Sequence, residues 1–240
     1  MASILIPTLG STDWRSLLGD PGKHWKRGKS AFECAVSWES AKQNPRGLPD
    51  QVAAMLDACE LTNGGALLLG IPEHQVVIEG GGHPSQNDLW ALLRTPKATI
   101  SMAVEAKSGE PFDKYVAEWI RDASSQSGKP KRLASLKKVL GIGEANLEGI
   151  RYQLMHRTAS PLLEATRFHA SAAVLLIQSF GGEKDDSSYK DYCRFCELME
   201  CESARNTLCL SNRKTDVPLL IGWLDCLPAS DMQVAESVGG

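Results

Sequence analysis

The sequence predicts a three-layer α/β fold in which helices cover both faces of a mixed central sheet. Three observations support this prediction. Apolar residues recur with helical spacing over residues 30–42 and 50–61, and strand-like stretches follow between residues 66 and 107. After further helical stretches, a strongly apolar strand is predicted at residues 172–177. Helices that precede and follow a run of strands can cover both of its faces.

Each of the first two helices ends at a clear break. The spacing i, i+3, i+4, i+7 is met by Phe32, Ala35, Val36 and Glu39, and a Pro/Gly-containing stretch at residues 44–49 follows this helix. The second helix carries its own apolar face and stops at an Asn-Gly-Gly sequence. We therefore expect two helices before the sheet begins.

Short apolar runs then replace the helical spacing. Residues 66–71 and 75–78 are two such runs, and three glycines separate them from residues 88–95 and 99–107. We interpret these stretches as three consecutive strands, antiparallel and partly buried. The last stretch alternates cleanly between apolar and more polar positions, as expected for a strand with one buried face.

The remaining elements are mostly helical. Helices are predicted at residues 115–123, 133–140 and 147–169, the last interrupted at Pro161, where Ser160 could cap a restarted helix. After the strand at residues 172–177, the pattern favours a helix at residues 189–199 and a final strand at residues 219–224. The domain prediction is an irregular segment at residues 1–29, a single domain at residues 30–227 and a disordered tail at residues 228–240.

Composition excludes some classes of protein. The chain has 240 residues and a net charge of −3, which argues against a histone-like binder of nucleic acid but permits a local basic cleft. No apolar run approaches the ~18 residues that a membrane-spanning helix needs, so we expect no membrane partner. The seven cysteines do not form a disulfide-like pattern. We therefore expect a cytoplasmic protein with reduced thiols.

Two predicted strands bring carboxylates together. Side chains on a strand alternate between faces, so Glu105 and Lys107 share a face about 7 Å apart. Asp88 stands at the start of the preceding strand and can face Glu105 across the ~5 Å between adjacent strands. Paired carboxylates are hard oxygen ligands suited to Mg²⁺ or Mn²⁺, and a lysine beside them could position a water molecule.

These residues resemble a known motif. Asn87-Asp88, followed by apolar residues and then by Val104-Glu105-Ala106-Lys107, is similar to the PD-(D/E)xK motif of the restriction-endonuclease-like nucleases, with Asn where the motif has Pro. The resemblance implies a restriction-endonuclease-like core and metal-dependent hydrolysis of phosphodiester bonds in DNA. Asp88 and Glu105 would bind the metal, and Lys107 would assist the attacking water.

The same resemblance suggests further residues. An acidic residue on the first core helix often joins the metal site of such nucleases. Here Glu39 is the candidate, with Glu33 and Glu60 behind it. A wider likeness, from about Trp25 to Trp223, is to a family of functionally uncharacterised bacterial proteins, and it implies fold rather than activity.

The helix after the sheet carries a polar stripe. Gln153, His156 and Arg157 lie on helical spacing within this stripe. In nucleases of this class, a polar residue here often flanks the catalytic site, which makes Gln153 a catalytic candidate. His156 and Arg157 are candidates for phosphate contact, as are Lys131 and Arg132 in the most basic stretch of the chain. A solvated helix face remains the alternative for each of these residues.

Other interpretations stay open. A Glu-x-Lys pair on a sheet is often only a solvated charge pair. The chain could also be a catalytically inactive nuclease-fold module that binds nucleic acid or a protein partner, or a metal-dependent hydrolase of a small phosphorylated compound. If it cuts both strands of DNA, a homodimer would supply the two active sites.

Overall fold

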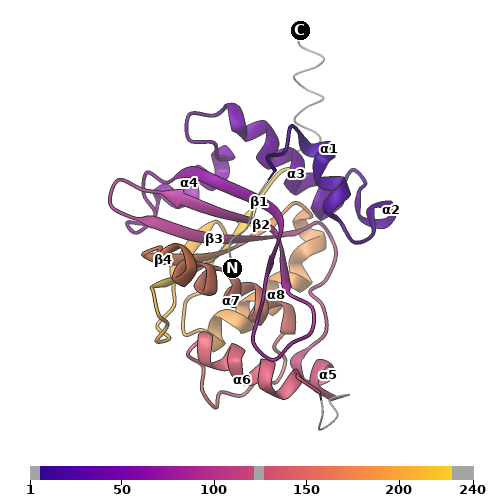
Figure 1. The fold of residues 1–240 in the computed structure, drawn as a ribbon, viewed down its shortest axis with the longest axis vertical. Helices are drawn as coiled ribbons and strands as arrows, with labels where there is room; N and C mark the ends of the chain where they lie inside the picture. The colour runs from indigo at the N-terminus through magenta and orange to yellow at the C-terminus, as the bar shows by residue number, and fades with distance from the viewer. Residues whose placement is uncertain (1–5, 122–126, 229–240) are drawn as a thin grey trace.

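The computed structural model describes residues 6–121 and 127–228, and these form a mixed α/β structure around one sheet of six strands. Figure 1 shows helices on both sides of the sheet. The strands lie in the spatial order β1-β2-β3-β4-β6-β5. Their bounds are β1 (Ala66–Val76), β2 (Ser85–Arg94), β3 (Thr99–Lys107), β4 (Ala172–Ser179), β5 (Thr207–Leu210) and β6 (Leu219–Asp225).

The sheet is antiparallel at its two edges and parallel in the middle. Strands β1, β2 and β3 form an antiparallel meander, and β5 pairs antiparallel with β6. Strand β4 pairs parallel with both β3 and β6, with Glu105 opposite Ile177 and Ile177 opposite Trp223. Parallel pairing needs a long crossover, and the chain between residues 107 and 172 supplies it with helices.

Buried apolar side chains gather on both faces of the sheet. The cluster on one face joins β4 to helix α7 (Tyr152–Phe168) through Leu175 and Leu154. The cluster on the other face joins β4 to helix α3 (Ser30–Ser40) through Leu176 and Val36. All eight residues of β4 are buried. A strand that is buried at every position and mostly apolar is expected where helices cover both faces of a sheet.

Helices therefore form the two outer layers. The layer that contains α3 also contains α1 (Ser11–Trp14) and α4 (Asp50–Asp57). The layer that contains α7 also contains α6 (Lys129–Val139) and α8 (Asp186–Leu198). The remaining helices are short: η1 (Arg15–Leu17), α2 (Pro21–His24), η2 (Ala41–Gln43), α5 (Val116–Arg121) and η3 (Gly182–Asp185). The predicted three-layer α/β class with a mixed central sheet is confirmed.

Several elements differ from the sequence-based expectation. Helix α7 runs without interruption through Pro161, although a proline removes one backbone hydrogen bond. Pro161 is buried, and the hydroxyl of Ser160, expected to cap a new helix, instead donates to the carbonyl of His156 at 3.0 Å. Packing against β2, β3 and β4 holds the helix together where the local rule predicts a break.

The remaining differences lie at the ends of the chain and at one edge of the sheet. The segment expected to be irregular, residues 1–29, contains short helical turns in its described part, and Trp14 from α1 is buried in the core. Strand β5 was not expected, because it is short and half-exposed. The predicted tail at residues 228–240 lies, apart from Pro228, outside the described residues.

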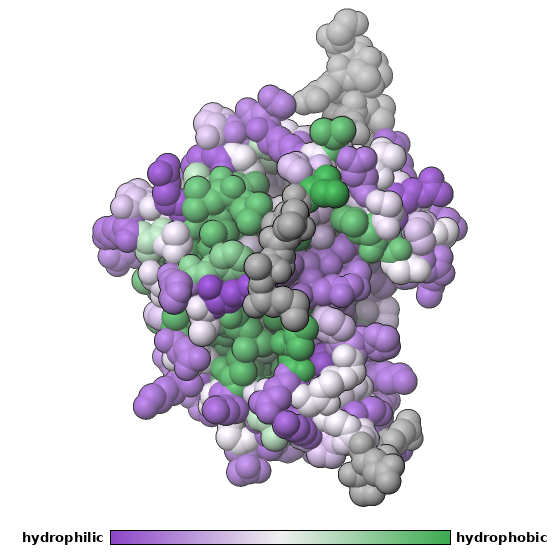
Figure 2. All heavy atoms as spheres, viewed as in Figure 1, coloured by the Kyte–Doolittle hydropathy of each residue, from purple (hydrophilic) through white to green (hydrophobic). Residues whose placement is uncertain are grey.

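The outer surface is mixed. Figure 2 shows apolar side chains gathered over part of the viewed face, with polar side chains over most of the remainder. Leu68 on the edge strand β1 is 52% exposed, and Val77 just beyond it is 79% exposed. Across the described ranges, no helix is long and apolar enough to cross a membrane.

Candidate functional site

Glu105 and Lys107 lie side by side near the end of β3. The ammonium group of Lys107 donates to Oε1 of Glu105 at 2.9 Å, and the side chains are only 3% and 4% exposed. The two-residue spacing that predicted a shared face is therefore confirmed. Because both side chains are buried, they are not the solvated charge pair that the sequence left open as an alternative.

Asp88 lies beside this pair, on the neighbouring strand. The last registered pair between β2 and β3 joins Leu89 to Val104, so Asp88 is the next residue along, opposite Glu105. Its Oδ2 accepts from the backbone N–H of Ala106 at 2.6 Å. Burial raises the pKa of Asp88 well above its ordinary value, and the negative charges of Glu105 and Glu73 raise it further.

A third carboxylate, Glu73 of β1, belongs to the same cluster. Its Oε2 accepts from Nε2 of Gln86 at 2.7 Å. Burial raises the pKa of Glu73 to about 7, and repulsion from Glu105 contributes in the same direction. The sequence analysis missed Glu73 because it divided β1 into two runs separated by Pro72-Glu73-His74. Glu73 has a φ of 53°, in the left-handed region, so the strand continues across an irregularity that the hydrophobic pattern does not reveal.

Helix α7 closes the cluster from one side. Gln153 donates from Nε2 to Oε1 of Glu105 at 2.7 Å, and Arg157 donates from Nε to Oε2 of Glu105 at 2.5 Å. Lys107 also reaches Oε1 of Gln153 at 3.3 Å. Burial opposes the charge on Glu105, but Lys107 and Arg157 outweigh it and lower the pKa of Glu105 below its ordinary value.

His156 and Arg157 take part in an interior network. Nδ1 of His156 lies 2.8 Å from Oγ of Ser85, and Nη1 of Arg157 donates to the same hydroxyl at 3.2 Å. Burial lowers the pKa of His156 well below its ordinary value, and the positive charges of Arg157, Arg132 and Lys107 lower it further. The polar stripe on this helix therefore points towards the sheet, and the open alternative of a solvated face does not describe these residues.

The other predicted phosphate contacts lie apart from the cluster. Lys131 is 68% exposed and pairs with Glu79 at 3.1 Å. Arg132 is 6% exposed, and it donates from Nε to the hydroxyl of Tyr152 at 2.6 Å. The structure does not bring either residue to Glu105, and only Lys131 offers its charge to the solvent.

The acidic candidates Glu39, Glu33 and Glu60 do not complete the cluster, and Glu60 lies beyond the end of α4. Glu39 accepts from the hydroxyl of Thr8 at 2.6 Å and from Nε1 of Trp14 at 2.7 Å, and it pairs with Lys42. These contacts tie α3 to the N-terminal segment, so Glu39 is engaged elsewhere. Glu33 is buried and accepts from the backbone of Gly28 at 2.8 Å, and Glu60 is 91% exposed.

The donor chemistry of the cluster fits a divalent cation. Asp88 and Glu73 are partly buried carboxylates, and neither forms an ion pair with any described residue. Their pKa values are raised first by burial and then by repulsion between the carboxylates, and a bound cation would offset both costs. Within residues 6–121 and 127–228, no group of three or more His, Cys, Asp and Glu side chains is already arranged around a single metal position.

Fold and site together define a class: a three-layer α/β protein with carboxylates and buried cations at the junction of β2, β3 and α7. The chain belongs to the family described as a domain of unknown function (DUF6946), which it matches over residues 7–226. Neither a curated protein nor a solved structure matches the chain.

Proposed function

We propose that this protein is a metal-dependent nuclease that hydrolyses phosphodiester bonds in DNA. The observation that carries the proposal is the contact between Glu105 and Lys107 at 2.9 Å, one strand away from Asp88. The resemblance to the PD-(D/E)xK nucleases supports it, because the residues that carry this motif occupy neighbouring strands of a three-layer α/β core.

The proposed roles follow from the contacts of each residue. Asp88 and Glu105 would hold Mg²⁺ or Mn²⁺, and Glu73 is positioned to join them. When bound, the cation would polarise a phosphoryl oxygen and lower the pKa of a water molecule. Lys107 would orient the attacking water and stabilise charge that develops on the phosphate. Gln153 would hold both Glu105 and Lys107 in place, since its amide contacts each of them.

The proposal extends to the assembly, the DNA contacts and the cellular compartment of the protein. A homodimer would present two active sites to the two strands of DNA. The exposed ammonium group of Lys131 would contact the phosphate backbone, where cations add affinity that weakens with salt. All seven cysteines are free thiols, which suits a reducing compartment such as the cytoplasm.

One observation favours a second candidate, a catalytically inactive module that uses the same fold to bind nucleic acid or a protein. Both oxygens of Glu105 already accept hydrogen bonds, from Lys107, Gln153 and Arg157. A closed network of this kind can serve structure alone, because buried charges are commonly paired and hydrogen-bonded. For catalysis, at least one of these contacts must open to a cation.

A titration with divalent cations separates the two candidates. Thermal unfolding would be followed in increasing Mg²⁺ or Mn²⁺, for the wild-type protein, Asp88→Asn, Glu105→Gln and the remote exposed control Glu60→Gln. Specific binding to the folded state raises the melting temperature with cation concentration. The nuclease proposal expects this rise in the wild type and in Glu60→Gln but not in the two cluster variants. A wild-type protein that does not respond would favour the inactive module.

A further inference from the structure

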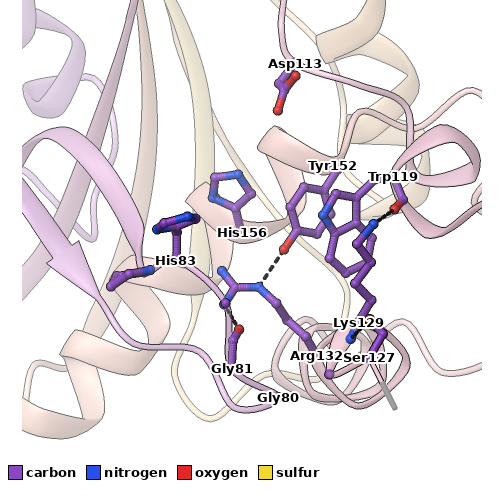
Figure 3. Close-up of a pocket in the computed structure, with 13 residues that line it drawn as sticks. Gly80, Gly81, His83, Asp113, Trp119, Ser127, Lys129, Arg132, Tyr152 and His156 are labelled. Carbon is purple, nitrogen blue, oxygen red and sulfur yellow. Dashed lines mark hydrogen bonds between the residues drawn. The ribbon is translucent and has the colours of Figure 1, made fainter. Parts of the chain in front are cut away.

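A second site lies on the same helix as the candidate cluster. A cavity of about 480 Å³ opens between the glycine loop Gly80–Gly82, the start of α6 and the first turns of α7. Figure 3 shows side chains from α6 and α7 pointing into it, among them Arg132, Tyr152 and His156. The volume is within the range of small-molecule sites in proteins.

Arg132 is a buried cation that forms no ion pair with any described residue. It is 6% exposed, and its guanidinium donates to two neutral acceptors, the hydroxyl of Tyr152 at 2.6 Å and the carbonyl of Gly81 at 2.8 Å (Figure 3). No described carboxylate forms an ion pair with it. Buried charges in proteins are normally paired, and Arg132 meets only neutral acceptors among the described residues. A guanidinium of this kind on a cavity wall suggests an anionic ligand.

The described side chains around Arg132 do not supply that negative charge. Burial raises the pKa of Tyr152, so its hydroxyl stays neutral, and His156 is kept neutral by burial and by the cations around it. Lys129 adds a second positive charge to the lining, with its ammonium donating to the carbonyl of Trp119 at 2.7 Å. Asp113 is the one acidic residue among the lining residues that the structure describes, and it is exposed.

The glycine loop gives the cavity an open wall. A Cβ on Gly80 would lie 2.3 Å from the backbone nitrogen of Arg132, so the loop is held directly against α6. A Cβ on Gly81 or Gly82 would meet nothing within 4 Å, so these residues border open space. On another wall, the indole of Trp119 stacks on the ring of Tyr152, with their centroids 3.9 Å apart. The cavity thus combines two cations with an aromatic wall.

Two lining residues connect the cavity to the carboxylate cluster. The backbone N–H of Asp113 donates to Oε1 of Gln153 at 3.1 Å, and Gln153 contacts Glu105. His156 shares the hydroxyl of Ser85 with Arg157, which also contacts Glu105. A ligand in the cavity would therefore lie only two side chains away from Glu105.

We propose that this cavity binds a phosphate monoester, the terminal phosphate of a nucleic-acid strand or of a free nucleotide. Two cations match a dianionic phosphate better than a singly charged group, and charge-assisted hydrogen bonds from guanidinium to phosphate are among the stronger ones in proteins. Assignment of the ligand to the end of a DNA strand rests on the proposed nuclease function, whereas the phosphate site itself does not.

The test compares two single-stranded DNA oligonucleotides that differ only in a 5′-phosphate or a 5′-hydroxyl. Both carry a 3′ fluorophore, and binding is measured by fluorescence anisotropy in EDTA, which prevents metal-dependent cleavage. We expect the phosphorylated strand to bind about tenfold more tightly, the size of one additional charged hydrogen-bond interaction. Thymidine 5′-monophosphate as competitor separates the two sources of phosphate. A much weaker affinity for it assigns the site to strand ends, and an equal affinity assigns it to free nucleotides.

Three variants assign the effect to the cavity. Arg132→Gln should abolish the preference for the phosphorylated strand, and Lys129→Gln, in which the half-buried cation is easier to replace, should reduce it several-fold. Lys131→Gln removes one charge from the same helix outside the cavity and should keep the preference. Equal affinity of the wild type for the two strands would overturn the proposal. The proposal would also be overturned if the preference for the phosphorylated strand stayed unchanged in Lys129→Gln and in any Arg132→Gln protein that folds.

This experiment is independent of cleavage. A phosphate preference without any nuclease activity would keep the phosphate site and reject the proposed function. Cleavage without a phosphate preference would keep the proposed nuclease function and reject the phosphate site.

Discussion

The charges in the cluster are unevenly neutralised. Glu105 is held by two cations, which lower its pKa. Asp88 and Glu73 form no ion pair with a described residue, and their pKa values are raised although the charge of Arg157 acts in the opposite direction. Burial and mutual repulsion are the shared causes of the two increases. The folded chain therefore bears an electrostatic cost at Asp88, and a site built to take a cation is expected to bear such a cost.

The first prediction concerns this cost. Asp88→Asn replaces the buried carboxyl group with a neutral amide and so removes this cost, and we expect it to raise the melting temperature of the metal-free protein at neutral pH. A rise of a few degrees, on the order of 1 kcal/mol for a chain of this length, is the expected size. The measurement is thermal unfolding in EDTA, followed by circular dichroism.

Asp57→Asn is the matched contrast. Arg46 donates to both oxygens of Asp57 at 2.7 and 2.9 Å, and these hydrogen bonds lower the pKa of Asp57. Its amide variant should therefore lower the melting temperature. If Asp88→Asn behaved in the same way as Asp57→Asn, the electrostatic description of the cluster would be wrong.

The second prediction concerns Glu39. Burial favours its protonated form, but hydrogen bonds from Lys42, Thr8 and Trp14 outweigh this and lower its pKa. A carboxyl with a lowered folded-state pKa stabilises the protein above its unfolded pKa, near 4.3, and loses that contribution as the pH falls through the folded value. Glu39→Gln should therefore cost about 1–3 kcal/mol at pH 7, and the difference from the wild type should shrink towards pH 3.

Chemical unfolding at several pH values measures this effect. The same variant should retain the wild-type response to Mn²⁺, because Glu39 contacts the N-terminal segment and not the cluster. Loss of the Mn²⁺ response would return Glu39 to the metal site for which the sequence analysis proposed it.

At the scale of single residues, sequence alone predicts neighbours within one element better than neighbours across elements. The contact of Glu105 with Lys107 follows from strand periodicity. Glu73 could not be found, because the irregularity at its positive φ hides the continuity of β1. The inward orientation of Arg157 and His156 also escaped prediction, since periodicity gives the face of a helix but does not say which face packs on the sheet.

At the scale of elements, the contact between the glycine loop and α6 is a close backbone approach. The φ of Gly80 is 104°, and a Cβ there would lie 2.3 Å from a backbone atom, whereas the φ of Gly81 is 77° with open space around it. Both positions strain a side-chain-bearing residue, but only Gly80 also has no room for one. The loop and helix are thus held as one unit.

The third prediction compares these two glycines. Gly81→Ala should cost about 1–2 kcal/mol, the cost of the left-handed conformation alone. Gly80→Ala should cost clearly more, because the loop must also move away from α6. The free energy of unfolding in urea measures both. Equal costs would mean that the contact with α6 contributes nothing to stability.

The bounds of strands were predicted well where one face or both faces of the strand are expected to be buried. Strand β3 was predicted with its observed bounds, and β4 and β6 nearly so, because long apolar or alternating stretches leave little ambiguity. Strand β5 was missed because four half-exposed residues carry too little pattern. Helix α7 was predicted to break at Pro161, since local rules cannot include the packing that keeps it whole.

At the scale of the whole molecule, one sheet links two apolar cores. Strand β4 contributes Leu175 to the core under α7 and Leu176 to the core under α3, and both side chains are almost fully buried. Neither core can lose its contacts with β4 without exposing the other, so we expect the domain to unfold as one cooperative unit.

The fourth prediction tests this cooperativity. Leu175→Ala and Leu176→Ala should each cost about 2–5 kcal/mol, the range for buried leucines. Each variant should still unfold in a single transition, with coincident curves from tryptophan fluorescence and circular dichroism. Two separate transitions in either variant would show that the layers unfold independently.

We have proposed that the cluster at Asp88, Glu105 and Lys107 hydrolyses phosphodiester bonds with the help of a divalent cation. The most direct test of this proposal is cleavage of plasmid DNA, single-stranded DNA and RNA in Mg²⁺, Mn²⁺ or EDTA. Wild type, Glu105→Gln, Lys107→Met and the control Glu60→Gln would be purified identically. We predict DNA cleavage that requires the cation, persists in Glu60→Gln and falls by at least about 100-fold in the two cluster variants. Wild-type protein that cleaves none of these substrates, or cluster variants that cleave as fast as wild type, would refute the nuclease proposal.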